Sequence, residues 1–431
     1  MRMSRQRWIV LVLVAAVIAG LALWLPWQPP RPAAAVSAHQ IPWPLRGLLF
    51  APALDGNVVD AAGAIGATGS TAIEVCGIGL VQVNSMQELL PELLATATRS
   101  PTLRRSIAEL GATSEPSNRA IALHYDAVLA AQGAIDAALA GNRDCANNEH
   151  CRSAADEMGT QAAAPYRQAL VQLADQNNDP IAFALAYKAC RRPSAPRIDA
   201  CSGVTASRWA ESDPDNGTPW LLVAAEAARV GDQTTRGEAM RHAAAAKRFD
   251  HYNEALLRPL ATASVQDAAR IDRFVVQTTT VGVFAAAPVT GYAEIATLCD
   301  SNALAEPQRR TQCDRLATVL VEADSTMLGL LMGARLGERV GWPAQRVAAL
   351  KEQLDAINGL SLDPRVQPGR WLGCEAFDLL QQRSSDMLRL GETGALRRAI
   401  AESGRPVAEL AREWRDYVRR EQERAQAAQQ K

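Results

Sequence analysis

Apolar and polar residues follow the period of amphipathic α-helices along almost the whole chain beyond residue 85. No run there shows the every-second-residue alternation of a half-buried β-strand. Prolines, glycines and Asx-Pro pairs interrupt the helical pattern at short intervals, and they mark where one helix ends and the next begins. The pattern therefore predicts an all-α fold built from helical hairpins or a solenoid-like array.

The same interruptions place the individual helices. A helix from Pro116 to Leu139 is expected, because Ser114 can cap it and proline is tolerated in a first turn. Further helices are expected at residues 181–189, 233–249, 267–286, 309–339 (as one helix or two), 343–358, 370–390 and 407–420. The tail after Arg420 has no apolar face and is expected to fray. Residues 48–82 are rich in glycine and small side chains, which predicts a loop with one short strand.

The N-terminus carries the strongest pattern. Residues Trp8–Leu25 form an uncharged stretch of 18 residues, which as a helix spans about 27 Å, close to the hydrocarbon thickness of a bilayer. The arginines in residues 1–7 precede it, so a single transmembrane helix with a cytoplasmic N-terminus and an exported remainder is predicted. A cleavable signal peptide ending near residues 36–38 is the alternative, and it also exports the domain. The proline-rich residues 26–47 predict an extended spacer.

These patterns divide the chain into six parts. The parts are a cytoplasmic tail (1–7), a membrane anchor or signal peptide (8–25), a spacer (26–47), an N-terminal helical subdomain with a small-residue-rich start (48–150), a region of helical repeats (151–265) and a C-terminal helical subdomain with a frayed tail (266–431).

Eight cysteines lie in the exported part of the chain. An even number there predicts disulfides, because compartments outside the cytoplasm are oxidising. Three pairs are close in sequence and flank short polar or turn-rich segments: Cys145–Cys151, Cys190–Cys201 and Cys299–Cys313. Elimination leaves Cys76 and Cys374, whose bond would join the start of the domain to its C-terminal third. A metal site is the alternative, but no CxxC occurs and the histidines do not space with the cysteines as zinc ligands would.

An Asp-Pro pair recurs after 34 residues, at Asp179-Pro180 and at Asp213-Pro214. Trp220 follows the second pair early in an expected helix, and Gly231-Asp232 ends that helix. Over about residues 151–263 the chain here resembles the tetratricopeptide repeat family, although the Leu-Gly pair usual in that family is missing. The resemblance implies pairs of antiparallel helices that stack into a concave surface for diverse partners. Generic hairpins that share the spacing by chance are the alternative.

Composition and motifs exclude several classes of function. The chain has 45 Lys+Arg against 46 Asp+Glu, so it lacks the basic surplus that a nucleic-acid partner requires. Residues 79–85 look like a signature of lytic transglycosylases, but the Glu-Ser pair that supplies the general acid of those enzymes is missing upstream. The glycines at 63, 66 and 69 are not followed by the Lys-Ser/Thr of a P-loop. We therefore expect no catalytic residue, no cofactor and no metal, and we favour a protein that is not an enzyme.

The expected function follows from this architecture. Abundant alanine and arginine with little lysine are typical of a GC-rich bacterial genome, so the anchor at residues 8–25 would sit in a bacterial inner membrane. The periplasmic helical domain would then be an interaction module that holds a protein or peptide, with Trp209 and Trp220 on its surface. An enzyme or small-molecule binder, with a site assembled from distant helices, is the alternative. A concave face with exposed aromatics would favour the first function, and a pocket with converging ionisable groups the second.

Overall fold

A computed structural model describes residues 71–83, 100–140, 148–191, 199–288, 291–366, 370 and 372–429. The expected membrane anchor and spacer lie outside these residues. In the described ranges, no helix combines the length and the apolarity needed to cross a bilayer. The described chain is almost entirely helical, as the periodicity predicts, with one β-hairpin at its start.

The elements and their bounds are as follows. The strands are β1 (Thr71–Val75) and β2 (Gly79–Val83). The α-helices are α4 (Pro101–Gly111), α5 (Pro116–Ala140), α6 (Glu149–Gln176), α7 (Pro180–Cys190), α8 (Ala206–Ser212), α9 (Gly217–Val230), α10 (Gln233–Ala245), α11 (Ala263–Gln266), α12 (Arg270–Ala286), α13 (Tyr292–Leu298), α14 (Pro307–Ala323), α15 (Met327–Val340), α16 (Ala344–Gly359), α17 (Cys374–Glu402) and α18 (Val407–Gln429). The 3-10 helices are η4 (Asp199–Gly203), η5 (Glu254–Ala261), η6 (Ala303–Ala305), η7 (Leu360–Leu362) and η8 (Pro364–Val366).

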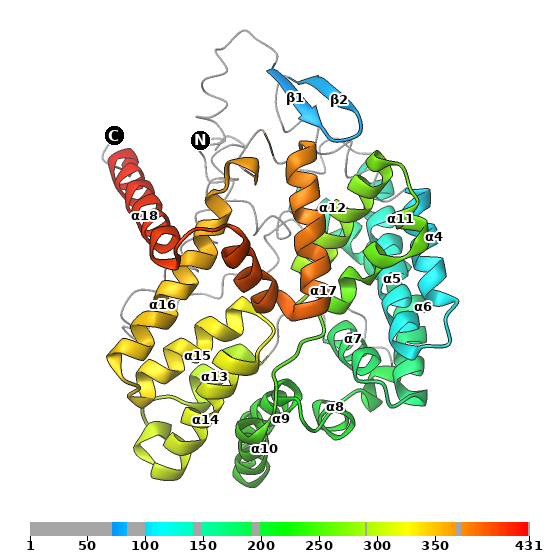
Figure 1. Ribbon diagram of the computed structural model, residues 1–431. Helices are drawn as coiled ribbons and strands as arrows, with labels where there is room; N and C mark the ends of the chain where they lie inside the picture. The colour runs from blue at the N-terminus through cyan, green and yellow to red at the C-terminus, as the bar shows by residue number, and fades with distance from the viewer. Residues whose placement is uncertain are drawn as a thin grey trace.

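The helices pack mainly as antiparallel neighbours. Helix α5 lies along α6, α9 along α10, α14 along α15, and α16 along α18. Figure 1 shows α4 to α7 on one side of the molecule, α13 to α16 on the other, and α17 between the two groups. Helix α17 contacts η5, α12, α15 and α16, so it connects the two groups. The largest apolar core runs from α4 through the hairpins to α14 and α15.

Side-chain caps set the helix starts. Asp179 accepts from the backbone N–H of Ala182 at the start of α7, where Pro180 fills the first turn. Asn216 and Asp232 cap α9 and α10 in the same manner. Asp213 has another role, because it ends α8, so the two Asp-Pro pairs are not equivalent. The predicted boundaries of α5, α7 and α16 agree with the structure to within a residue or two.

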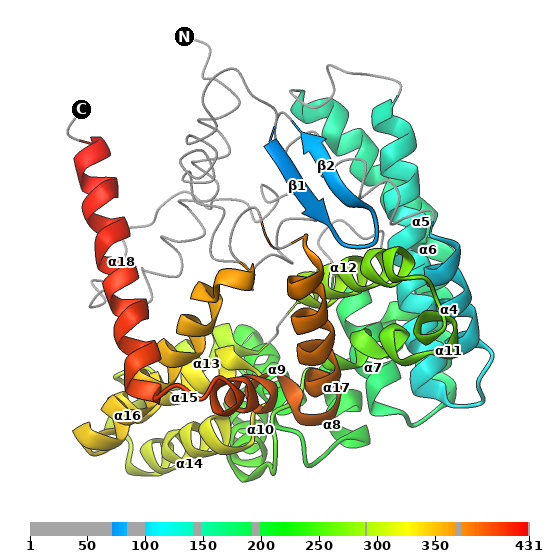
Figure 2. The same ribbon diagram turned by 45° about the horizontal axis from the view of Figure 1, so that its top comes forward.

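The start of the domain differs from the prediction, because two strands form instead of one. They pair antiparallel, with Thr71 opposite Val83 and Val75 opposite Gly79. The inner face of the hairpin packs in a small core with residues from α12 and α17, and Figure 2 shows it above those helices. Ile73 and Val75 of β1 are buried in this core.

Three helices depart from the predicted ones. Helix α10 ends at Ala245 and not at Phe249, because the backbone beyond it pairs with residues before α9 and after α14. Helix α17 continues to Glu402 through a kink at Gly391, where φ is 71°. The tail expected to fray after Arg420 is instead the second half of α18, along which Arg424 pairs with Glu421.

Three disulfides join described cysteines: Cys76–Cys374, Cys190–Cys201 and Cys299–Cys313. They are the same pairs that the spacing predicts. Cys151 is also disulfide-bonded, and its expected partner, Cys145, lies outside the described residues. Because disulfides persist in oxidising compartments, these bonds indicate an extracytoplasmic location.

Candidate functional site

An extended segment, residues 246–253, crosses the interior between α10 and η5. The backbone N–H of Gly217 donates to the carbonyl of Arg248 (2.8 Å), and that of Phe249 donates to the carbonyl of Ala323 (3.2 Å). Tyr252 has a φ of 56°, the one positive value among the described non-glycine residues. Its backbone N–H donates to Asp250 Oδ1 at 2.7 Å. The segment thus places polar side chains in the core, where their charges are expensive unless they are paired.

Buried carboxyl groups gather around this segment from three elements. Burial raises the pKa of Asp250 to about 6, and it raises the pKa of Asp324 and of Glu392 each to about 7. The nearby carboxylate of Glu254 adds to all three shifts. The Tyr292 hydroxyl donates to Asp324 Oδ2 at 2.5 Å, and burial followed by the Asp324 charge raises the pKa of that tyrosine. These acids therefore take up protons near neutral pH.

Lys188 connects this acidic cluster to the next feature of the site. Its ammonium donates to the carbonyl of His251 and to Asn253 Oδ1, each at 2.5 Å. Its side chain is only 4% exposed, and burial lowers its pKa to about 8, against the opposing charges of Glu254 and Asp250. Two of the three ammonium protons are therefore committed to the segment at 246–253.

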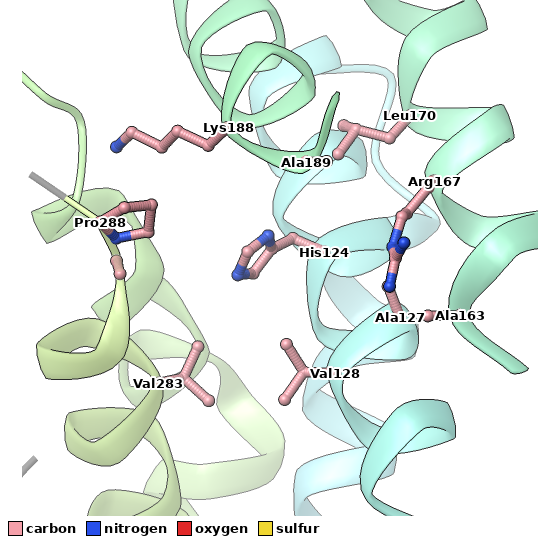
Figure 3. A pocket seen from close by; sticks show the side chains of 11 residues that line it. His124, Ala127, Val128, Ala163, Arg167, Leu170, Lys188, Ala189, Val283 and Pro288 are labelled. Atoms are coloured by element: carbon pink, nitrogen blue, oxygen red, sulfur yellow. The ribbon is translucent and has the colours of Figure 1, made fainter. Parts of the chain in front are cut away.

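Lys188 also lines a partly open cavity of about 30 Å³ between α5, α6, α7 and the end of α12. This volume is room for about two water molecules or one small ion. Figure 3 shows Lys188 at the top of the cavity, His124 near its centre, and Val128 facing Val283 below. Apart from Arg167, the other described residues that line the cavity are apolar, and none of the described lining residues is acidic. Its electrostatics are therefore cationic in an apolar setting.

Arg167 completes the cavity from α6. Its side chain is 5% exposed, it makes no hydrogen bond or ion pair with any described residue, and its Nη1 is buried without a partner. Burial lowers its pKa, with no opposing carboxylate nearby. Figure 3 shows the guanidinium pointing toward the small side chains of Ala127 and Ala163.

A second buried arginine, Arg383, offers a comparison, because its Nε is also buried without a hydrogen-bond partner among the described residues. Arg383 is buried to a similar extent, at 8% exposure, and burial also lowers its pKa. The Asp363 carboxylate opposes that shift and compensates part of the guanidinium charge. Arg167 has no neighbouring carboxylate among the described residues, so a compensating negative charge would have to come from elsewhere.

The two tryptophans predicted to form a surface differ, because only Trp220 reaches solvent. Trp209 is completely buried, with its ring centroid 5.7 Å from that of Tyr187, so its prediction as an exposed aromatic is wrong. Its neighbours on α8 are all small or polar, and the sequence does not distinguish a core tryptophan there from an exposed one. Trp220 is half-buried, stacked on His242 at 4.2 Å, and its Nε1 donates to the carbonyl of Pro214.

Sequence reasoning missed the residues that matter most here. Lys188 did leave a signal, because it is one of four lysines in the chain and follows the apolar run at residues 181–187. Arg167 left none, since an arginine beside an apolar stripe normally extends to solvent. The described residues contain no cluster of three or more side chains suited to a metal. Comparisons with protein-family models, with curated proteins and with solved structures find no match to this chain.

Proposed function

We propose that this protein is an exported binding protein that holds a small anionic ligand in the cavity lined by Arg167 and Lys188. One observation carries the proposal: the guanidinium of Arg167 is buried, faces a cavity and has no partner among the described residues. A buried charge without a partner costs several kcal/mol, and a bound anion would recover much of that cost.

The arrangement supports binding more than catalysis. The described cavity walls offer a guanidinium, an ammonium and an imidazole, and none of the described lining residues carries a hydroxyl, thiol or carboxyl group that could act as a nucleophile. Two of the three Lys188 protons are already used in hydrogen bonds. This side chain is therefore better suited to supplying a fixed positive potential than to exchanging protons with a substrate.

The tether is part of the same proposal. Residues 8–25 would anchor the protein in a bacterial inner membrane, and residues 26–47 would hold the helical domain in the periplasm. The disulfides support this location, because they need an oxidising compartment. A binding domain held near the membrane would meet anions that enter the periplasm.

Thermal unfolding of the full-length protein in mild detergent tests the proposal. The reference buffer contains gluconate, an anion too large for a 30 Å³ cavity. In the test samples chloride, acetate or phosphate replaces gluconate at constant ionic strength. We expect at least one small anion to raise the unfolding temperature with a saturable dependence, as ligand binding to the native state requires. The effect should disappear in Arg167→Met. If gluconate and all small anions give the same unfolding temperature, the proposal fails.

A second candidate function is the interaction module with tetratricopeptide-like hairpins. The observation that favours it is the apolar tip of the β-hairpin, where Ile78 is 56% and Leu80 is 75% exposed. Isolating the full-length protein from its native envelope, beside an Ile78→Ser, Leu80→Ser variant, would test this candidate. A stoichiometric partner that is lost only from the variant would support it, and identical recovery of both proteins alone would contradict it.

A further inference from the structure

We infer that the ligand is a short aliphatic carboxylate, such as acetate or propionate, with its carboxylate on Arg167 and its methyl end toward Val128 and Val283. The inference rests on the proposed anion-binding function and names the chemical class of the ligand. Charge, donor geometry and the character of the walls each support it.

The charge balance favours a monoanion. Lys188 already lies near the carboxylates of Glu254 and Asp250, and it donates to two oxygens of the segment at 246–253. The uncompensated charge at the cavity is therefore the single positive charge of Arg167. A carboxylate neutralises it, whereas a phosphate dianion would leave a surplus negative charge in an apolar setting, at a large desolvation cost.

The donor geometry favours a carboxylate among the monoanions. A guanidinium presents two parallel N–H groups that match the two oxygens of a carboxylate, and such bidentate pairs are stronger than single contacts. Chloride is a single acceptor atom, so it can accept from both N–H groups only through bent hydrogen bonds. Ala127 and Ala163, toward which the guanidinium points (Figure 3), both line the cavity, and their side chains are small.

The remaining walls favour an aliphatic tail. Apart from the imidazole of His124, they are mainly aliphatic, with the side chains of Val128, Leu170, Ala189, Val283 and Pro288. A ligand hydroxyl or amine placed against these aliphatic side chains would lose its hydrogen bonds to water without replacement, so hydroxy acids and amino acids are disfavoured. The cavity volume of about 30 Å³ admits only a few water-sized groups, which limits the chain to about two or three carbons.

Calorimetric titration of the full-length protein in mild detergent and gluconate buffer tests the inference. The probes are acetate, propionate, hexanoate, phosphate, chloride and the neutral acetamide. We expect acetate or propionate to bind at least tenfold more tightly than each of the other four. Arg167→Lys should weaken that binding about tenfold by replacing the fork with a point charge, and Arg167→Met should abolish it.

The possible outcomes separate the inference from the proposed function. If phosphate or chloride binds more tightly than every carboxylate, and Arg167→Met abolishes that binding, the inference is overturned while the anion-binding function stands. If no probe binds, both are overturned. If the Arg167 variants fail to fold, the wild-type protein supplies the test. We expect magnetisation transfer from the methyl group of bound propionate to the methyl groups of Val128 and Val283. The variants Val128→Ala and Val283→Ala assign these signals. Transfer to other methyl groups only would overturn the inference.

Discussion

At the scale of the residue, Arg167 should lower the free energy of unfolding of the protein when no ligand is bound. Arg167→Met removes a buried, unpaired charge and keeps a long apolar side chain between Ala163 and Leu170. Because a desolvated charge without a partner is unfavourable, we expect the variant to gain about 1–3 kcal/mol in the free energy of unfolding. Urea denaturation in gluconate buffer measures this difference, and a variant less stable than wild type would show that Arg167 has a structural partner.

The same substitution at a paired arginine is the control. Arg248 donates to Asp213 Oδ1 at 2.6 Å and to the Tyr252 hydroxyl at 3.1 Å, and Asp213 is 5% exposed. Arg248→Met leaves that carboxylate buried with one hydrogen-bond donor fewer, so it should lower stability by about 1–3 kcal/mol. Opposite signs at the two positions would separate an arginine kept for a ligand from one kept for the fold.

The sequence predicts such residues unevenly. Lys188 directly follows an apolar run, at a position where a buried helix would normally continue with an apolar residue. Residues that break the local pattern in this way are often functional. Arg167 and Trp209 show the limit, because either residue type occurs both on helix surfaces and in cores. Only the three-dimensional neighbours decide which one applies, and those neighbours come from other helices.

At the scale of the element, the β-hairpin depends on one glycine for contact with α12. Gly77 has a φ of 86°, and a Cβ there would approach the backbone N of Ile271 to 2.7 Å. Gly79 has a φ of 101°, but a Cβ there would meet nothing within 4 Å. Gly77→Ala combines backbone strain with a clash, whereas Gly79→Ala introduces strain alone.

We therefore expect Gly77→Ala to destabilise the protein by about 2–4 kcal/mol and Gly79→Ala by about 1–2 kcal/mol. Hydrogen exchange should show the extra loss in β1 and at the start of α12. Equal effects of the two substitutions would mean that the hairpin is not fixed against that helix.

Elements were predictable where local chemistry defines them. Asp179 with Pro180, and Gly231 with Asp232, mark helix ends through caps and backbone conformations that any chain would need there. The exit from helix at Ala245 was not predictable, because it depends on hydrogen bonds to residues near 216 and 324, far away in the chain. The polar interior of the site is built on that exit.

At the scale of the whole molecule, the disulfides differ in how much chain they enclose. Cys76–Cys374 closes a loop with a sequence separation of 298, and Cys190–Cys201 one with a separation of 11. In the chain-entropy model the first bond stabilises by about 5 kcal/mol and the second by about 3 kcal/mol. Replacing both cysteines of each pair by serine should reproduce this order in urea denaturation. A larger loss at the short loop would show that local packing, and not loop closure, governs the effect.

The buried acids should also make the stability of the whole domain depend on pH. Folding raises the pKa of Asp324 and of Glu392 to about 7, and that of Asp250 to about 6, from ordinary values near 4. Between these limits the folded state binds more protons than the unfolded chain, so these acids make stability rise as pH falls. His251 opposes them, because it is completely buried and its pKa lies well below 6.5, so it costs stability below that pH.

Burial lowers the pKa of Lys188 to about 8, so between pH 8 and 7 the unfolded chain binds that proton more strongly and Lys188 opposes the acids. From pH 7 to 6.5 Lys188 is largely protonated in both states and the acids dominate, and below pH 6.5 two or more carboxyl groups still outweigh one imidazole. Stability should therefore increase as pH falls from 7 to about 5, at a rate that approaches 1.4 kcal/mol per pH unit for each group. Urea denaturation across pH 5 to 8 measures the profile. Asp324→Asn removes one of the titrating carboxyl groups, so the stability of the variant should depend less steeply on pH. A wild-type profile that falls toward pH 5 would show that the acids are ionised in the folded core and paired by groups other than those described.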